Sequence, residues 1–174
     1  MEQKSPDLAE IEIFDSIDNF WGTGPTDFKV KLDAVKGAST IKLLLNSPGG
    51  SVFDGMAIAS MLAVHRAKLD VEIIGIGASI ASIIALAGRK LTMAKGAYFM
   101  IHNPLTFTAG DAADLRKTAD ILDKMKGDFI DVYETKSKMS RETISGLMDD
   151  ETWYSDKEAV AAGFADDISD YGKV

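Results

Sequence analysis

Hydrophobic and polar positions change their period several times along the 174-residue chain, and each change predicts a different element. Alternating apolar and charged residues, or short β-branched runs, predict strands at 10–14, 41–45, 71–76, 91–94, 98–101, 152–154 and 164–168. Apolar residues at helical spacing predict helices at 26–37, 52–66, 80–87, 111–139, 140–148 and 155–163. Because strands and helices alternate, we expect a single α/β domain over residues 1–174, built from βαβ units.

Two local signals define a helix start and a turn more closely. Thr26 or Asp27 is expected to cap the first helix, since both side chains can accept a hydrogen bond from a free backbone N–H. The dipeptide Lys95-Gly96 predicts a hairpin that joins the strands at 91–94 and 98–101.

The helix predicted at 111–139 is long and highly charged. Its apolar residues follow a seven-residue repeat with an intermediate position, at Leu115, Leu122, Met125, Phe129 and Val132. At 1.5 Å per residue the helix is about 43 Å long, whereas a compact domain of this size has a radius of gyration of about 16 Å. We therefore expect the last four of these residues to be covered by another subunit. The alternative is an ordinary amphipathic surface helix.

Charge and composition exclude several classes of function. The formal net charge is −8, which argues against nucleic acid and anionic membranes as partners. The chain has no cysteine, and no metal-ligand spacing is present, so we expect neither a metal nor a cofactor. Its polar start does not resemble a signal peptide, and no apolar run is long enough to span a bilayer. We therefore expect a cytoplasmic location.

The segment Gly75–Ser82 carries the first candidate for chemistry. A buried strand runs into a Gly-Ala-Ser corner, and a helix of small apolar residues follows. At such a corner the Ser79 hydroxyl is exposed, and the N–H groups of the helix's first turn lack partners and can face an oxyanion. The alternative is a tight turn in which Ser79 only caps the helix.

Two further strand ends carry candidate residues. After the strand at 41–45, the run Asn46–Val52 contains paired glycines, which permit positive φ and can aim free N–H groups into a cleft. After the strand at 98–101, His102 is followed by Asn-Pro, which places the histidine at a strand end facing a cleft or a turn. The alternatives are a plain strand-to-helix connection and a structural histidine.

Together these stretches resemble the proteolytic subunit of the Clp (caseinolytic) serine peptidase family. Asn46–Val52 is similar to the family's oxyanion loop, Gly75–Gly88 to its nucleophile segment, and Met100–Pro104 to its histidine segment. The run Trp153–Asp166 is similar to the family's C-terminal pattern. The resemblance therefore extends over most of the chain from Ile41 onward.

The resemblance implies a serine endopeptidase with an α/β fold of repeated β-β-α units, shared by Clp peptidases and crotonases, and a protruding handle helix at about 111–139. The matching positions are Ser79 for the nucleophile, His102 for the general base, Glu151 for the acid of the triad, and Gly50 and Ile80 for the backbone donors to the oxyanion.

The chain departs from the family pattern at three places. Gly77 stands where the family usually has alanine. Glu151 stands where the family has its catalytic aspartate, and the adjacent Asp150 is a second candidate for that role. The N-terminal part, which forms gating loops in the family, matches poorly, so docking of an ATP-driven unfoldase is not implied.

The resemblance further implies a homo-oligomer that acts on protein or peptide substrates, as a ring of six or seven subunits or a stacked pair of such rings. The Trp-containing start and the Glu-Thr-Trp stretch are most similar to phage and prophage members, which act in capsid maturation. Two other functions stay open: a crotonase-like acyl-thioester enzyme that binds coenzyme A, and a catalytically inactive ring scaffold. Labelling by a serine-reactive fluorophosphonate separates the peptidase from the acyl-thioester enzyme.

Overall fold

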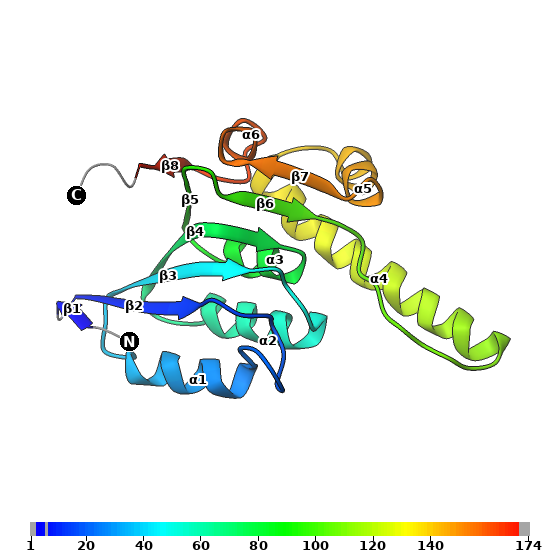
Figure 1. Ribbon diagram of the computed structural model, residues 1–174, viewed down its shortest axis with the longest axis horizontal. Coiled ribbons are helices and arrows are strands. Elements are labelled where there is room, and N and C mark those ends of the chain that lie inside the picture. Colours follow the sequence, from blue (N-terminus) through cyan, green and yellow to red (C-terminus); the bar gives the residue numbers. More distant parts are fainter. Residues whose placement is uncertain (1–2, 6, 171–174) are drawn as a thin grey trace.

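The structure is a computed structural model that describes residues 3–5 and 7–170. Eight strands form a single sheet, with helices packed around it (Figure 1). The strands are β1 (Gln3–Ser5), β2 (Leu8–Ile13), β3 (Thr40–Ser47), β4 (Lys68–Ala78), β5 (Lys90–Ala94), β6 (Tyr98–Ile101), β7 (Thr152–Ser155) and β8 (Asp167–Ser169). The helices are α1 (Pro25–Ala34), α2 (Val52–Ala63), α3 (Ile80–Leu86), α4 (Ala112–Ser137), α5 (Arg141–Asp149) and α6 (Asp156–Ala161).

Most neighbouring strands of the sheet run parallel, in the order β1-β2-β3-β4-β5-β8, and β6 pairs with both β4 and β7. The antiparallel pairs are β1 with β2 and β6 with β7. Strands and helices alternate singly from β2 to β5, and β-β-α successions occur at β1-β2-α1 and β5-β6-α4. The predicted α/β class is therefore confirmed.

The core lies between the sheet and the helices that cover it. Helix α2 contacts both α1 and α3, and Figure 1 shows α1 and α2 side by side along the sheet. Alternate residues of β2 and β3 point into this layer, among them Ile11, Leu43 and Leu45, which are fully buried. Each such side chain stabilises the fold by about 1.5–3 kcal/mol. The strand ends that carry the candidate residues are therefore held by a packed scaffold.

The predicted hairpin at Lys95-Gly96 is wrong. Strands β5 and β6 both run parallel to β4, β5 beside Asp70–Ile73 and β6 beside Ile76–Ala78, so the turn moves the chain along β4 without reversing it. Gly96 has a φ of +83°, and its N–H donates to Asp156 Oδ2 at 2.9 Å. This bond to α6, together with the pairing of β6 with β7, holds β6 away from β5.

Two predicted boundaries also differ from the structure. The first helix begins at Pro25 with Gly24 as its N-cap, earlier than either predicted capping residue. Proline fits the first helical position because no backbone N–H is needed there. The last strand is confined to β8, since the N–H groups of Phe164 and Ala165 donate to the Ala159 carbonyl of α6 and do not pair with a strand.

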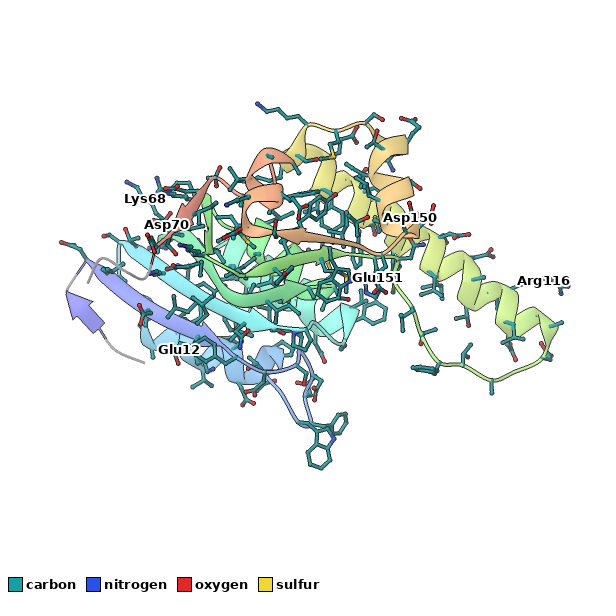
Figure 2. The ribbon with its side chains drawn as sticks, turned by 45° about the horizontal axis from the view of Figure 1, so that its top comes forward. Glu12, Lys68, Asp70, Arg116, Asp150 and Glu151 are labelled. Carbon is teal, nitrogen blue, oxygen red and sulfur yellow. The ribbon has the colours of Figure 1, made fainter. Side chains whose placement is uncertain are left out.

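Helix α4 is the long helix predicted from the sequence, and it projects beyond the sheet (Figure 1). It spans 26 residues, or about 39 Å, and Figure 2 labels Arg116 near its outer end. Phe129 is 4% exposed and packs in the chain's own core, so the expectation that it needs cover from another subunit is wrong. Leu115 in the outer half is 46% exposed. The other predicted residues of the repeat are half-buried: Leu122, Met125 and Val132.

Candidate active site

Ser79 occupies the junction between β4 and α3, and its backbone is strained. It is the N-cap of α3, with a φ of +56° and a ψ of −131°, which costs a non-glycine residue on the order of 1–3 kcal/mol. Its N–H donates to the Met100 carbonyl at 3.1 Å, and its carbonyl accepts from the Ser82 N–H at 2.9 Å. The Ser79 side chain makes no capping hydrogen bond to α3. Helix capping is therefore not the role of this hydroxyl.

His102 lies next to Ser79 because β4 and β6 are parallel neighbours. Ala78 pairs with Met100, which places both candidate residues just beyond the carboxyl ends of these strands. His102 Nε2 and Ser79 Oγ are 2.7 Å apart, a hydrogen-bond distance. Burial lowers the pKa of His102, and the nearby Glu151 carboxylate partly opposes this shift. The imidazole is therefore neutral at pH 7, the form that can accept a proton.

Glu151 approaches the other nitrogen of this imidazole. Strand β7 is antiparallel to β6 and pairs Thr152 with Ile101, so the residue before Thr152 comes opposite the histidine. Glu151 Oε2 lies 3.9 Å from His102 Nδ1, which is longer than a hydrogen bond, and the Glu151 side chain is 58% exposed. The Trp153 indole N–H donates to Glu151 Oε1 at 3.3 Å.

The two aspartates that precede Glu151 make different contacts. Asp149 accepts from the Asn103 amide at 2.7 Å and from the Lys126 ammonium at 2.6 Å, which ties the segment after β6 to α4 and α5. Asp150 is the exposed C-cap of α5. Figure 2 labels Asp150 and Glu151 at the junction of α5 and β7. Of the two predicted candidates, the structure brings Glu151 rather than Asp150 within ion-pair distance of the histidine.

The paired glycines lie directly against the corner between β4 and α3 that carries Ser79. Gly49 and Gly50 have φ values of +93° and +149°. A Cβ atom at Gly49 would lie 2.7 Å from Ser79 Cβ, so only glycine permits this approach. The N–H groups of Gly50 and Ile80 donate to no other residue in the described part of the chain. They are therefore free to bind an oxygen atom of a substrate.

Ile17 holds this glycine loop from the opposite side. Its N–H donates to the Gly49 carbonyl at 2.8 Å, and its carbonyl accepts from the Ser51 N–H at 2.7 Å. The Ile17 side chain is fully buried. Our sequence analysis did not single out this residue. An isoleucine between polar neighbours was the available signal, but it does not indicate which backbone segment Ile17 will pair with.

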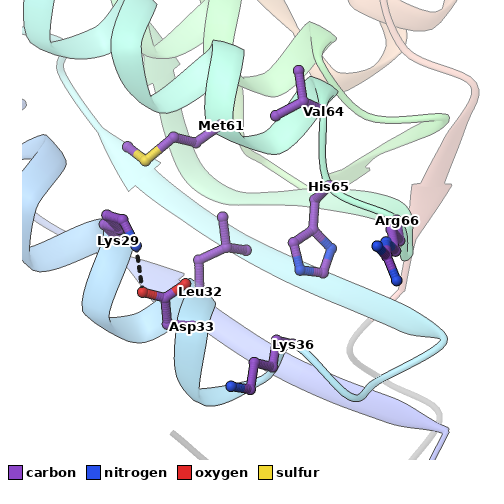
Figure 3. Close-up of a pocket in the computed structure, with 8 residues that line it drawn as sticks. All are labelled: Lys29, Leu32, Asp33, Lys36, Met61, Val64, His65 and Arg66. Carbon is purple, nitrogen blue, oxygen red and sulfur yellow. Dashed lines mark hydrogen bonds and ion pairs between the residues drawn. The ribbon is translucent and has the colours of Figure 1, made fainter.

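Two cavities differ in their relation to these residues. A cavity of about 320 Å³ lies beside Gly50, between the start of α2, the segment at Leu105 and Thr106, and one face of α4. It can accept a side chain of an extended peptide whose backbone passes the glycine loop. A cavity of about 440 Å³ lies between the C-terminal parts of α1 and α2, lined by Lys29 and His65 among others (Figure 3). No candidate residue lines this second cavity.

No three acidic or histidine side chains among residues 3–5 and 7–170 are grouped so that they could hold a metal ion. No helix within the same ranges combines the length and the apolar character that crossing a membrane requires.

Fold and site together define a mixed α/β protein with a serine and a histidine paired at one edge of a mostly parallel sheet. The profile of the Clp protease family matches residues 11–172 of this chain. Relatives from Streptococcus pneumoniae strains Hungary19A-6, CGSP14 and JJA are named ATP-dependent Clp protease proteolytic subunit. Each is 31% identical over 141 residues, which cover 79% of this chain and 72% of the relative. The chain belongs to the Clp protease family.

Proposed function

We propose that this chain is a serine endopeptidase in which Ser79 is the nucleophile, His102 the general base and Glu151 the acid that orients it. The observation that carries the proposal is the 2.7 Å distance between His102 Nε2 and Ser79 Oγ at a strained strand-to-helix corner. The relatives' name, proteolytic subunit, supports hydrolysis of peptide bonds. An acyl-thioester enzyme and an inactive scaffold have no need of this serine-histidine pair.

Acylation begins when the Ser79 hydroxyl attacks a peptide carbonyl and His102 Nε2 takes the hydroxyl proton. The carbonyl oxygen becomes an oxyanion, which the free N–H groups of Gly50 and Ile80 can bind. Each such donor lowers the barrier by about 3–4 kcal/mol in related chemistry. The imidazolium then gives its proton to the leaving amine, and an acyl ester remains on Ser79.

Deacylation repeats these steps with water. The neutral imidazole takes a proton from a water molecule, the resulting hydroxide attacks the ester, and the proton returns to Ser79 as the peptide acid leaves. The Glu151 carboxylate stabilises the imidazolium that forms in both halves of the reaction. Since Glu151 is 3.9 Å from His102 Nδ1, we propose that its side chain moves closer as the histidine becomes charged.

A fluorophosphonate tests the nucleophile directly, because it reacts with an activated serine hydroxyl and loses fluoride. We expect mass spectrometry to locate one phosphonyl group on Ser79. Ser79→Ala is expected to abolish labelling and to lower the rate of peptide hydrolysis by more than about 10³-fold, with an unchanged circular dichroism spectrum. Ser60→Ala, at an exposed position of α2, is the matched control and should be labelled like the wild type.

The same experiment contains the outcomes that contradict the proposal. Labelling of a different serine would refute the assignment of Ser79. A folded wild-type protein that is not labelled would refute the peptidase. In that case, binding of a coenzyme A thioester would favour the acyl-thioester enzyme, and a stable ring without thioester binding would favour the scaffold.

We further propose that the active form is a homo-oligomeric ring of six or seven subunits, single or stacked. Exposed apolar side chains on the outer half of α4 and just before it support assembly. The relatives are named ATP-dependent, and an ATP-driven unfoldase as a partner of this chain is supported by that name alone. A role in phage capsid maturation, in the cytoplasm of a bacterial or infected cell, is supported by the two tryptophan-containing stretches.

A further inference from the structure

The long helix α4 reaches the nucleophile corner through two hydroxyl groups. The Tyr133 hydroxyl oxygen lies 2.7 Å from Ser82 Oγ, in the first turn of α3. The Ser82 hydroxyl donates to the Ser79 carbonyl at 2.6 Å. Both side chains are buried, with exposed fractions of 1% for Tyr133 and 0% for Ser82. We call the series Tyr133, Ser82 and the Ser79 carbonyl the hydroxyl relay.

The direction of each hydrogen bond in the relay follows from counting protons. A serine hydroxyl has one proton, and Ser82 gives it to the Ser79 carbonyl, which can only accept. Ser82 Oγ must therefore accept from the Tyr133 hydroxyl. Burial raises the pKa of Tyr133, so this hydroxyl keeps its proton across the neutral pH range. The relay thus runs in one direction, from α4 to the backbone of the nucleophile.

The accepting carbonyl belongs to the same peptide unit as the Ile80 N–H. Because a peptide unit is planar, holding the Ser79 carbonyl also fixes the direction of this N–H. The carbonyl accepts two hydrogen bonds, from the Ser82 hydroxyl at 2.6 Å and from the Ser82 N–H at 2.9 Å. Hydrogen bonds in series polarise one another. The Ile80 N–H is therefore both oriented and strengthened as a donor.

We propose that Ser82 and Tyr133 are positioning residues, which hold the Ser79–Ile80 peptide in place for binding of the oxyanion. This inference rests on the proposed peptidase function. The relay also holds Ser79 in the conformation with positive φ that places its hydroxyl beside His102. The orientation of α4 is thereby linked to the geometry of the site.

Three single variants separate the relay from ordinary core packing. Tyr133→Phe removes only the outer hydroxyl and keeps the ring, which packs edge-on against Phe164 with 5.8 Å between ring centroids. Ser82→Ala removes the middle hydroxyl. Tyr154→Phe is the matched control, because Tyr154 contacts the same phenylalanine and its buried hydroxyl bonds to no other described residue.

The main readout is the second-order rate of fluorophosphonate labelling at Ser79, with kcat and KM for a quenched fluorogenic peptide as the second. We expect Ser82→Ala to lower the labelling rate and kcat by about 10- to 100-fold. Tyr133→Phe is expected to lower both by about fivefold. KM should change by less than about twofold, because ground-state binding is not affected. Tyr154→Phe should leave all three values unchanged.

A double variant tests whether the two hydroxyls act in series. Adding Tyr133→Phe to Ser82→Ala is expected to cause no further loss of rate, since the relay is already broken. A further loss in the double variant, or an equal loss in Tyr154→Phe, would indicate a general packing effect and overturn the proposal. Wild-type rates in both single relay variants would also overturn it, while the peptidase assignment would stand. Absence of labelling in the wild type contradicts the peptidase itself and is seen before any variant is compared.

Discussion

At the residue scale, the balance on His102 decides how the site responds to pH. Burial disfavours the imidazolium and lowers the pKa of His102, whereas the Glu151 carboxylate stabilises the imidazolium and raises it. Burial is the larger effect. The histidine therefore becomes protonated, and the peptidase inactive, only at a pH below the usual histidine value of about 6.5.

The first prediction follows from this balance. We expect kcat/KM of the wild type to fall with decreasing pH, with a midpoint below about 6.5. Glu151→Gln removes the opposing charge, so the pKa of His102 falls further and the midpoint moves to still lower pH. The same change should lower kcat by about 10- to 100-fold, because the imidazolium loses its stabilising carboxylate. Both effects are measured from pH–rate profiles between pH 4 and 8.

Asp150→Asn is the matched control for this prediction. It removes the adjacent carboxylate, which belongs to the C-cap residue of α5 and makes no ion pair with the histidine among the described residues. We expect its pH profile and kcat to equal those of the wild type. A shift of the acid limb in Asp150→Asn, together with a wild-type profile in Glu151→Gln, would exchange the roles of the two acids.

The residues of the candidate site differ in how far the sequence could predict them. Ser79 and His102 each follow a buried strand directly, and the carboxyl ends of neighbouring parallel strands meet at one edge. Glu151 could be placed only through the family resemblance, because its approach to the histidine depends on the antiparallel register of β7 with β6. The contact between Ser82 and Tyr133 joins residues 51 positions apart and depends on how α4 packs. No local pattern indicates such a contact.

At the scale of elements, the glycine loop between β3 and α2 sets the shape of the site. The loop is held on one side by Ile17 and approaches Ser79 on the other. The loop presents the free Gly50 N–H only while its backbone keeps the positive φ values. The geometry of the candidate site therefore depends on the conformation of this loop.

A second prediction separates crowding at this loop from backbone strain. Gly49→Ala introduces a Cβ at 2.7 Å from Ser79 Cβ and forces alanine to a φ of +93°. We expect loss of at least about 10²-fold in kcat and in fluorophosphonate labelling. Gly96→Ala is the matched control, since Gly96 also has positive φ, at +83°, but nothing lies within 4 Å of the added atom. It should lower the melting temperature slightly and leave kcat unchanged.

A wild-type kcat in both variants would show that the site does not depend on glycine at position 49. Equal melting temperatures with activity lost only in Gly49→Ala would show that its role is confined to the site. We expect activity to be lost only in Gly49→Ala, because there the added atom would lie 2.7 Å from both Ser79 Cβ and the Ala78 carbonyl oxygen.

The elements of the fold could be predicted where the local pattern of apolar residues determines them. The prediction failed where the structure depends on which strands pair with each other. The strands β3 and β6 follow from the apolar patterns at 41–45 and 98–101. The hairpin at Lys95-Gly96 failed because a glycine turn does not specify whether the next strand pairs with the previous one or with a third. Here β4 is long enough, at 11 residues, to pair with both.

At the scale of the whole molecule, the outer part of α4 and the segment before it lack cover. Figure 1 shows the chain running outward after β6 and returning along α4. Phe107 is 97% exposed and Leu115 is 46% exposed, whereas Phe129 and Tyr133 in the inner half of α4 are buried. Exposed apolar side chains gathered on one projecting part indicate an interface. Leu122 and Met125 of α4 line the cavity beside Gly50, so an interface on this helix adjoins the candidate site.

The last prediction tests assembly and its link to activity. We expect the wild type to form a ring, seen by light scattering at micromolar concentration. The double variant Phe107→Asp, Leu115→Asp should be a folded monomer, because it places two charges in the proposed interface and neither residue lines the cavity. Val30→Asp, at an exposed position of α1, is the matched control and should assemble normally. A monomeric wild type would refute the ring.

Since Glu151 lies shortly after α4 and is 3.9 Å from His102 Nδ1, we expect assembly to bring this pair closer and the monomeric variant to lose about tenfold in kcat. A fully active monomer would refute that coupling and leave the assembly prediction standing.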